Sequence, residues 1–427
     1  MSGTHNLREL ARQIAKDVTA VDDFIVSNKL PYPSSTADTP LLFPVDPSHG
    51  DVYKARIDAI QALDSLRGLL LSPPERAMLQ MQYMETAALQ ALRRFDVFKA
   101  VPIDGHASYS QIAEQCSIPE DRLRRFLRYA MACGFFDERD GLVSHSASSA
   151  VFLRIPLWYD MLGMVTELAF PAMPNVVNAM QKFPGSSEPN ETGLNVAFGM
   201  DKTAFEWFAE DEARSVLFAN AMKATMSAPG YNAEFIVKGH DWARYSDGLI
   251  VDVGGSNGHV SVQLAKQFAN LKFVVQDFPS AFKDAAESVP KDLRVRVEFM
   301  AHNFFETQPI RGASVYLLRW ILHDWSDPYC VKILRALVPA LRNGSRILIA
   351  DNTMPPRGSL PNHEEKLRSF ADLMMMAFHN SKERSPEQFW ALFQEADPRF
   401  KLVEFRQPEG SSLGFMEVLF ENESEEP

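Results

Sequence analysis

The sequence predicts an α/β protein in which a helical N-terminal half precedes an open sheet of mainly parallel strands. Two observations carry this prediction. Before residue 240, apolar residues recur at helical spacing, and beyond it strand-like runs alternate at first with helical stretches, which is typical of parallel strands joined by crossover helices. We expect strands at 248–253, 271–276, 295–300, 313–319, 345–350, 401–406 and 414–420.

Length and composition limit the possible classes. The 427 residues are too many for one ordinary domain, so two or three are expected. A formal net charge of −12 argues against nucleic acid and against a membrane surface as partners, because both attract clustered Lys and Arg. No run approaches the roughly 20 apolar residues of a membrane-spanning helix. The three scattered cysteines imply no disulfide framework, so a cytoplasmic location is expected.

A Pro/Ser-rich linker divides the N-terminal half. A helix is expected over 5–28, the linker covers 30–50, and helical periodicity resumes at 52–71 and 74–98. Within Ser108–Ser144 a short helix, a turn, a longer helix and a two-stranded ribbon follow. This order is a winged-helix pattern.

The winged-helix pattern leaves two interpretations open. One is DNA binding, because the second helix carries four arginines. The other is a module for protein–protein contact or dimerisation with a solvated basic face, and the acidic balance of the whole chain favours it. The arginines are Arg122, Arg124, Arg125 and Arg128.

The segment before the sheet is helical and rich in Met, Phe and Trp. Most of these side chains are expected in a hydrophobic core, and a second role as the wall of an apolar pocket is open. We therefore expect three regions: a helical domain over 1–155, a bridging segment over 156–240, and the sheet domain over 241–427.

The first expected strand of the sheet ends in a glycine turn, Asp252-Val-Gly-Gly-Ser-Asn-Gly258. Glycine lets backbone approach a ligand closely, and the following helix directs its N-terminal N–H groups toward that ligand. The dinucleotide fingerprint requires glycines at positions 253, 255 and 258, but position 253 is Val. No Gly-Lys-Ser/Thr follows the turn, so a Walker-type phosphate loop is absent.

Polar and aromatic residues follow the next two strands. Asp277 ends the second strand, where a carboxylate can accept both hydroxyls of a ribose; a surface acid at a strand end is the alternative. Asn303 and Phe304 follow the third strand, where an amide and an aromatic ring suit the edge and the face of an adenine.

Further blocks complete a recognisable pattern. They are Leu318-Arg-Trp-Ile-Leu-His-Asp-Trp-Ser-Asp327, Ala350-Asp-Asn-Thr-Met-Pro355 and Asp372-Leu-Met-Met-Met376 before Lys382-Glu-Arg-Ser385. With the glycine turn and Asp277, they resemble the S-adenosylmethionine-dependent O-methyltransferases of the caffeic acid type, particularly fungal secondary-metabolite members. The resemblance covers nearly the whole chain.

The resemblance implies both architecture and roles. It implies a Rossmann-like class I methyltransferase domain that binds S-adenosylmethionine, a winged-helix dimerisation domain that forms a homodimer, and a bridging segment that lines the pocket of a small-molecule natural product. The implied catalytic base is His323, flanked by the acids Asp351 and Glu383. The implied cofactor residues are Gly254, Gly255, Asp277, Phe278, Asn303, Phe304 and Arg319, and the implied substrate pocket contains Phe218, Met222, Met374, Met376, Phe378 and His379.

Three positions depart from the family pattern. Ser256 stands where many members have Gly, Asn303 replaces a common acid, and Arg319 replaces Lys. None of these changes removes a group that the cofactor needs, because the carbonyl oxygen of Asn still accepts a hydrogen bond.

The chemistry expected at His323 is proton removal. A phenol is a poor nucleophile while protonated, and a neutral imidazole within hydrogen-bond reach can take its proton. An acid on the other ring nitrogen would fix the tautomer and stabilise the imidazolium. The alternative is a strand-end histidine satisfied by backbone, and the acids Asp351 and Glu383 favour the base.

Other chemistries are less favoured by the sequence. His302 and His379 have no partners at metal-ligand spacing, so no metal site is expected, and no Gly-x-Ser-x-Gly elbow is present. The favoured function is methyl transfer to a hydroxyl of an aromatic or polyketide-type molecule in secondary metabolism. A pericyclase or dehydratase of the same fold, which binds the cofactor without methyl transfer, remains the alternative.

Overall fold

The computed structural model describes residues 6–81, 83–228, 230–245, 247–281 and 285–421. By backbone contacts the chain forms two compact units, each of which is described by itself. The first unit contains Met1–Pro171, Phe208–Ala224 and Arg357–Leu367; the second contains Ala172–Trp207, Thr225–Pro356 and Arg368–Pro427.

The first unit begins with two long helices, α1 (Leu7–Ser27) and α2 (Asp51–Leu70). Helix α1 starts where Asn6 accepts a 2.9 Å hydrogen bond from the backbone N–H of Glu9, because a side-chain oxygen satisfies an amide that has no partner within the helix. A small core that includes Val21 and Ile25 of α1 lies beneath the helices.

The helical pattern predicted over 74–98 is present, but it is divided. The structure has three shorter helices, α3 (Pro73–Gln80), α4 (Met84–Arg94) and α5 (Val97–Ala100). Helix α4 cannot continue into α5 because Asp96 has a left-handed backbone with φ of 54°, a conformation that a right-handed helix does not accommodate.

A small antiparallel sheet follows, with the strand order β1-β3-β2. The predicted short helix, longer helix and ribbon are all present, and their apolar side chains form one core. Of the four arginines on the longer helix, Arg124 pairs with Glu120 and lies over the ring of Tyr109. The elements are β1 (His106–Ser108), α6 (Tyr109–Cys116), α7 (Glu120–Ala132), β2 (Asp137–Arg139) and β3 (Leu142–Ser144).

The region between the two sheets is helical, as predicted. It includes a π-helical segment, η2 (Met164–Ala169). The α-helices are α8 (Ala147–Arg154), α9 (Pro156–Gly163), α10 (Phe170–Ala172), α11 (Val176–Lys182), α12 (Gly193–Phe198), α13 (Ala204–Ala209), α14 (Glu212–Ser227) and α15 (Glu234–Gly239).

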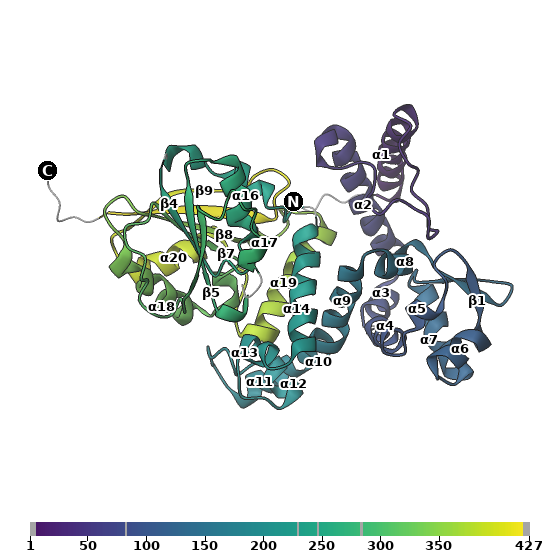
Figure 1. Cartoon of the computed structure of the whole chain (residues 1–427). Helices are drawn as coiled ribbons and strands as arrows, with labels where there is room; N and C mark the ends of the chain where they lie inside the picture. Colours follow the sequence, from purple (N-terminus) through teal and green to yellow (C-terminus); the bar gives the residue numbers. More distant parts are fainter. Residues whose placement is uncertain (1–5, 82, 229, 246, 282–284, 422–427) are drawn as a thin grey trace. The chain divides into compact units, whose positions relative to one another are not determined.

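The second unit is built on a seven-stranded sheet of order β6-β5-β4-β7-β8-β10-β9 (Figure 1). All seven predicted strands are present, and β10 pairs antiparallel with both β8 and β9, so the last two strands form a hairpin. The strands are β4 (Leu249–Val253), β5 (Lys272–Asp277), β6 (Val297–Ala301), β7 (Val315–Arg319), β8 (Arg346–Asn352), β9 (Phe400–Arg406) and β10 (Leu413–Phe420).

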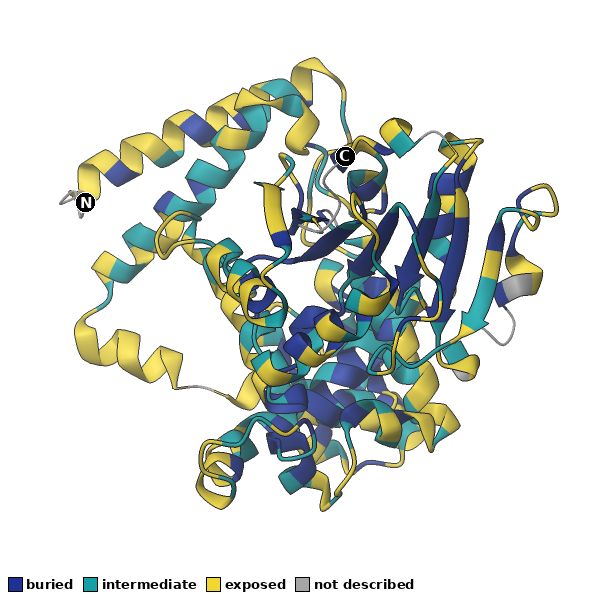
Figure 2. Cartoon of the chain, turned by 90° about the vertical axis from the view of Figure 1, so that its left-hand side faces the viewer, coloured by how far each residue is buried: buried dark blue, intermediate teal, exposed yellow. Residues whose placement is uncertain are grey.

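Helices cover both faces of this sheet, so its central strands are buried on both sides (Figure 2). Successive residues of a strand point to opposite faces: Val251 joins the core beneath α18 and α20, whereas Ile250 joins the core beneath α15 and α16. The covering helices of the sheet are α16 (His259–Gln267), α18 (Asp327–Leu337) and α20 (Pro386–Ala396), and the loops carry α17 (Ala285–Ser288) and α19 (Asn362–His379).

The strand order reverses at β4, which pairs with β5 on one side and β7 on the other. Open α/β sheets bind ligands at the carboxyl ends of the strands beside such a reversal. The parallel strands β4, β5, β6, β7 and β8 all end at this edge, so the sheet brings their following loops together. In the described part of the chain, no helix has the length and apolar character needed to span a membrane.

Candidate active site

The glycine turn after β4 is closely packed. Gly254 has φ of 70° and Gly258 has φ of 71°, a region that residues with a Cβ rarely adopt. A Cβ on Gly254 would lie 2.3 Å from Cδ1 of Ile321, and one on Gly255 would lie 2.6 Å from Cγ of Asp252. Ser256 also has a positive φ, of 50°, so the position where the family often has Gly keeps a backbone that favours Gly.

Asp277 at the end of β5 fixes this turn. Its Oδ2 atom accepts a 2.9 Å hydrogen bond from the N–H of Ser256, and Oδ1 accepts one of 2.7 Å from the N–H of Phe278. Burial raises the pKa of Asp277, and the two backbone donors partly offset this rise. The side chain of Phe278 is 54% exposed, which leaves its ring accessible to a ligand at the sheet edge.

The loop after β6 places an amide and an aromatic cluster beside the turn. The side-chain oxygen of Asn303 accepts a 3.1 Å hydrogen bond from the N–H of Phe305, so one of the two hydrogen bonds that this oxygen can accept is made within the loop. Phe304 packs edge-to-face against Trp325, with the ring centroids 5.9 Å apart. These two predicted cofactor residues therefore lie in an ordered, partly apolar loop.

Arg319 ends β7 as a mostly buried cation. Its guanidinium lies 4.6 Å from the ring centroid of Trp320, and Nη1 lies 3.9 Å from Sδ of Met226. Burial lowers the pKa of Arg319, against the opposing effect of the acids Asp252 and Asp351. The Nε atom of Arg319 and the indole N–H of Trp320 have no hydrogen-bond partner among the described residues, so two buried donors remain available at this edge.

His323 lies in a short 3-10 turn, η6 (Leu322–Asp324), directly after β7. Its Nδ1 atom is 3.2 Å from Oε1 of Glu383. The same carboxylate oxygen accepts a 2.8 Å hydrogen bond from Nδ2 of Asn352, and the backbone N–H of Glu383 donates to Asp372 at 2.9 Å. The predicted base and one predicted acid are therefore in direct contact, and the acid is itself held by two neighbours.

Three nearby carboxylates affect the pKa of His323. Burial alone would lower its pKa, but Asp324, Glu383 and Asp351 together raise the pKa of His323 to about 10. Burial alone would raise the pKa of Glu383, but His323 and Asn352 lower it below its usual value. The neighbouring carboxylates therefore favour the protonated form of His323.

Asp351 lies on β8 and is 1% exposed. Its carboxylate approaches the backbone of Leu322, but no side chain among the described residues donates a hydrogen bond to it. Burial raises the pKa of Asp351 to about 6, with Glu383 adding to the rise. Asp351 therefore acts on His323 through its charge, whereas Glu383 also fixes the ring.

The structure adds two residues next to the base. Oδ1 of Asp324 lies 3.6 Å from Nε2 of His323 and 3.7 Å from Nε2 of His379. Burial raises the pKa of Asp324 to about 7 and lowers that of His379 to about 3. The sequence motifs assign no role to Asp324 or Asn352, although Asp324 directly follows His323 and Asn352 directly follows Asp351.

The predicted substrate-pocket residues lie on two helices. Phe218 and Met222 lie on α14 in the first unit, where Phe218 stacks on Phe208 with centroids 4.8 Å apart. On α19, Met374, Phe378 and His379 are buried, whereas Met376 is 38% exposed. His379 also stacks on Phe205, with ring centroids 4.9 Å apart.

One cluster with metal-ligand chemistry lies away from this edge. His240, Glu404 and Glu417 have potential ligand atoms within 4.8 Å of one another. Arginines already pair with both acids: Arg244 and Arg346 bind Oε1 of Glu417, and Nη2 of Arg406 lies 3.6 Å from Oε1 of Glu404. Burial lowers the pKa of His240 to about 3, and these arginines add to the effect. The cluster is therefore better described as a buried ion network than as a cation site.

Comparison with known proteins places the chain among characterised relatives. Residues 186–398 match the family model described as an O-methyltransferase domain. The chain is 36% identical over 422 residues to the grayanic acid biosynthesis cluster O-methyltransferase of Cladonia grayi, covering 98% of this chain and 88% of that protein. It is 35% identical to the O-methyltransferase aurJ of Gibberella zeae, covering 97% and 98% of the two chains.

Solved structures share the fold. OxaC has a TM-score of 0.74 at 22% identity, over 96% of this chain and all of that one. LepI in complex with SAM has a TM-score of 0.72 at 22% identity with the same coverage of 96% and 100%. The mitomycin 7-O-methyltransferase MmcR has a TM-score of 0.67 at 24% identity, over 86% of this chain and 99% of that one.

Proposed function

We propose a specific reaction for this chain from the premise that it belongs to the O-methyltransferase family. It is an S-adenosylmethionine-dependent O-methyltransferase. The proposed acceptor is a hydroxyl of an aromatic or polyketide-type natural product, and His323 is the proposed general base. The observation that carries this proposal is the contact of 3.2 Å between Nδ1 of His323 and Oε1 of Glu383, at the sheet edge that also holds the glycine turn.

The residues at this edge fit S-adenosylmethionine. The glycine turn has no room for a Cβ at Gly254 or Gly255, and buried donors remain available on Arg319 and Trp320. In the proposed assignment, Gly254, Gly255 and Asp277 hold the methionine part and the ribose, Phe278, Asn303 and Phe304 hold the adenine, and Arg319 lies near the cofactor. When bound, S-adenosylmethionine supplies a methyl group on a positively charged sulfur.

In the proposed mechanism, His323 removes the proton of the acceptor hydroxyl with Nε2, because Nδ1 faces Glu383. The hydroxyl oxygen becomes a stronger nucleophile as its proton leaves. Glu383 and Asp351 stabilise the imidazolium that results, and Asn352 keeps the Glu383 carboxylate in place. Much of the rate would come from the orientation of the acceptor oxygen.

The proposed acceptor site includes the side chains predicted from the sequence. Buried Met374 and Phe378 on α19 offer apolar surface within the second unit, and thioethers adapt well to flat aromatic rings. His379 lies beside Asp324 at 3.7 Å, which adds polar groups next to the base. Met376, Phe218 and Met222 remain proposed pocket residues on the strength of the family resemblance.

One incubation tests the reaction. Purified protein is mixed with methyl-labelled S-adenosylmethionine and a panel of phenolic polyketides, and label transfer and S-adenosylhomocysteine are both measured. We expect transfer that falls at least about 10²-fold in His323→Ala and is unchanged in the control His106→Ala, which alters an exposed histidine. Isomerised or dehydrated product without S-adenosylhomocysteine would instead support a pericyclase or dehydratase.

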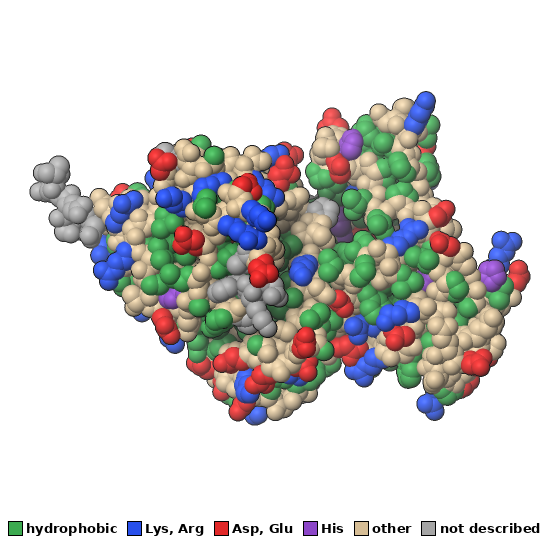
Figure 3. All heavy atoms as spheres, viewed as in Figure 1, with side chains coloured by type: hydrophobic (Ala, Val, Ile, Leu, Met, Phe, Trp, Pro, Cys, Tyr) green, Lys and Arg blue, Asp and Glu red, His purple; other side chains and the backbone are tan. Residues whose placement is uncertain are grey.

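We also propose a homodimer formed by the N-terminal region. Support comes from apolar side chains that are exposed on its helices and in the connection between α3 and α4, and hydrophobic side chains are visible at the surface in Figure 3. A second copy of the same chain would cover them. They include Leu69 at 55%, Leu70 at 65%, Met78 at 61%, Met81 at 63% and Tyr83 at 64% exposure. Light scattering after gel filtration tests this, and a monomer at micromolar concentration would contradict it.

We assign one proposed role to each of the three expected regions: dimerisation to a winged-helix domain over 1–155, substrate binding to the bridging segment over 156–240, and catalysis to 241–427. A cytoplasmic location is also proposed, supported by three free cysteines at positions 116, 133 and 330. The catalytic part of this proposal is supported by the family model, which matches 186–398.

A further inference from the structure

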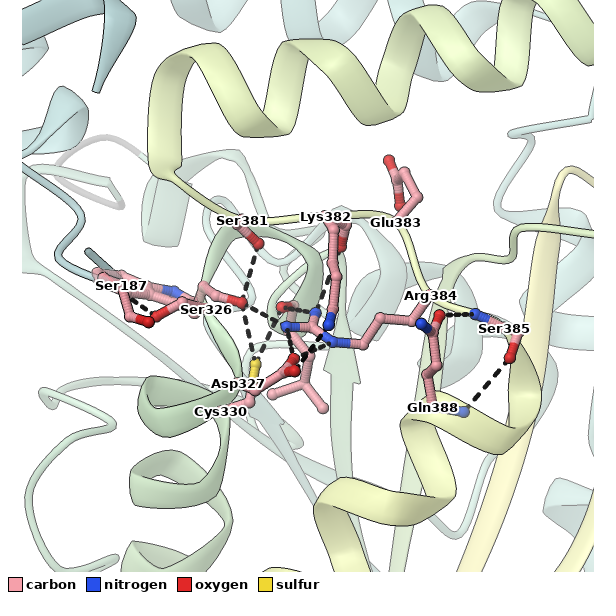
Figure 4. A network of polar contacts seen from close by, with 12 residues as sticks. Ser187, Ser326, Asp327, Cys330, Ser381, Lys382, Glu383, Arg384, Ser385 and Gln388 are labelled. Atoms are coloured by element: carbon pink, nitrogen blue, oxygen red, sulfur yellow. Dashed lines mark hydrogen bonds and ion pairs between the residues drawn. The ribbon is translucent and has the colours of Figure 1, made fainter. Parts of the chain in front are cut away.

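The turn that carries His323 is held by side chains from the segment that carries Glu383. Two backbone carbonyls of this turn, those of Leu322 and Trp325, point toward residues 381–384, and a network of polar side chains surrounds them (Figure 4). None of the side chains that donate to these carbonyls has a role in the proposed cofactor binding or proton transfer.

Arg384 is the centre of the network and is 0% exposed. Its Nη1 donates to the carbonyl of Leu322 at 2.7 Å, and Nη2 donates to that of Trp325 at 2.7 Å. On the other side of the guanidinium, Nε and Nη2 lie 3.0 and 2.7 Å from Oδ1 of Asp327. One planar group therefore binds both ends of the turn and the first residue of α18.

Two further donors support the same carbonyls. The hydroxyl of Ser381 donates to the carbonyl of His323 and, at 2.9 Å, to that of Trp325. The thiol of Cys330 lies 3.1 Å from the carbonyl of Leu322 and 3.2 Å from that of Trp325. The turn is thus held from the 381–384 segment and from α18 together, as Figure 4 shows.

We propose that Arg384 is a positioning residue for the base: its guanidinium binds the carbonyls on either side of His323 and so keeps Nδ1 of His323 in reach of Glu383. The inference rests on the proposed role of His323. Arg384 directly follows Glu383 in the chain, so displacement of the guanidinium would move the turn and the acid relative to each other. A misplacement of about 1 Å is enough to cost on the order of 10²-fold in rate.

The proposed role of Arg384 depends on the planar shape of its guanidinium. A guanidinium presents several N–H donors in a rigid fork, whereas the ammonium of lysine is a compact point charge. Lysine at this position would keep the positive charge beside Asp327 but would not reach both carbonyls at once. The substitution Arg384→Lys therefore distinguishes the effect of the positive charge of Arg384 from the effect of its hydrogen-bond geometry.

The chain offers a matched control in Arg296. Its Nη1 donates to the carbonyls of Phe268 and Leu271 at 3.1 and 3.0 Å, and Nη2 donates to that of Ala265 at 2.7 Å. Arg296 thus also holds several carbonyls in the same unit, near the end of α16, but it makes no contact with the turn of His323. Arg296→Lys removes comparable bonds without touching the base.

The experiment compares the turnover number, cofactor affinity and pH profile of the two variants. We expect Arg384→Lys to lower kcat by about 10- to 100-fold, to keep the dissociation constant for S-adenosylhomocysteine within about two-fold, and to shift the rising limb of kcat/KM to lower pH. That shift is expected because a displaced imidazolium loses part of its stabilisation by Glu383. Arg296→Lys should change none of these quantities by more than about three-fold.

Equal kcat values and pH profiles for the two lysine variants would overturn the inference and leave Arg384 with a purely structural role. If Arg384→Lys does not fold, Ser381→Ala is measured instead, because it removes the one hydroxyl that donates to the carbonyls of His323 and Trp325; an unchanged kcat would overturn the inference. His323→Ala distinguishes a failure of the positioning role of Arg384 from a failure of the proposed base. If it is inactive while Arg384→Lys is fully active, only the positioning role fails, whereas full activity of His323→Ala removes the proposed base itself.

Discussion

Nδ1 of His323 and Oε1 of Glu383 lie 3.2 Å apart, although 60 residues separate them in the chain. Both side chains are buried, with 11% and 3% of their surface exposed. The contact joins a turn after β7 to a segment after α19. In the proposed mechanism this contact leaves Nε2 of His323 for the acceptor, and the predictions for catalysis follow from it.

Glu383→Gln should lower kcat by about 10²- to 10⁴-fold. The substituted amide can donate a hydrogen bond to Nδ1, which would leave the proton on Nε2 and make that nitrogen useless as a base. Asp351→Asn should cost clearly less, because Asp351 contributes charge without a hydrogen bond to the ring. Steady-state kinetics at saturating cofactor check the order, and a greater loss in Asp351→Asn would contradict it.

The pH profile of kcat/KM should rise into the alkaline range. Carboxylates raise the pKa of His323 to about 10 in the free protein, and kcat/KM reports ionisations of the free enzyme. Asp324→Asn removes one of these carboxylates, so the imidazolium is less stabilised and the rising limb should move to lower pH. A limb that stays in place, or that moves to higher pH, would show that Asp324 does not stabilise the imidazolium.

Asp277→Asn should weaken cofactor binding by about 10- to 100-fold. Hydrogen bonds to a charged acceptor contribute about 1.5–3 kcal/mol, and Asp277 accepts two from the glycine turn, so the substitution loosens the turn as well as the proposed ribose contact. Calorimetric titration with S-adenosylhomocysteine measures the change. Lys272→Asn, at the opposite and exposed end of β5, is the control and should bind normally.

His240 should make the folded protein sensitive to acid. Burial and the neighbouring arginines lower the pKa of His240 to about 3, from 6.5 in the unfolded chain. The unfolded chain therefore takes up a proton more readily, and stability is lost as the pH falls from about 6.5 toward 3. His240→Gln should reduce the slope of unfolding free energy against pH between 6 and 4 by up to about 1.4 kcal/mol per pH unit.

Chemical denaturation at several pH values measures that slope. His106→Gln, which changes an exposed histidine of the first unit, is the control and should leave the slope as it is. An unchanged slope in His240→Gln would mean that His240 binds its proton in the folded state, and the buried ion network around Glu417 would then have to carry a different charge.

Much of the fold was predictable because its signals are local. Seven strands could be located from apolar runs, and the reversal of direction at β10 could be read from the short Gln407–Gly410 connection. The division of the helical pattern at 74–98 has a local cause that apolar spacing does not reveal, since Asp96 adopts a left-handed backbone in the middle of that pattern. Apolar periodicity reports which side faces the core, and it carries no information on such interruptions.

The sequence by itself determined the sheet and the glycine turn, because each belongs to a motif of neighbouring residues, and the family resemblance named His323, Asp351 and Glu383 as candidates. Only the tertiary structure decided how these candidates are arranged. It placed Glu383, and not Asp351, on Nδ1 of His323, set Asp324 between His323 and His379, and buried Arg384 beneath the turn. Some of these contacts join residues that are distant in sequence, and others depend on the direction in which a side chain points. The spacing of residues along the sequence reveals neither.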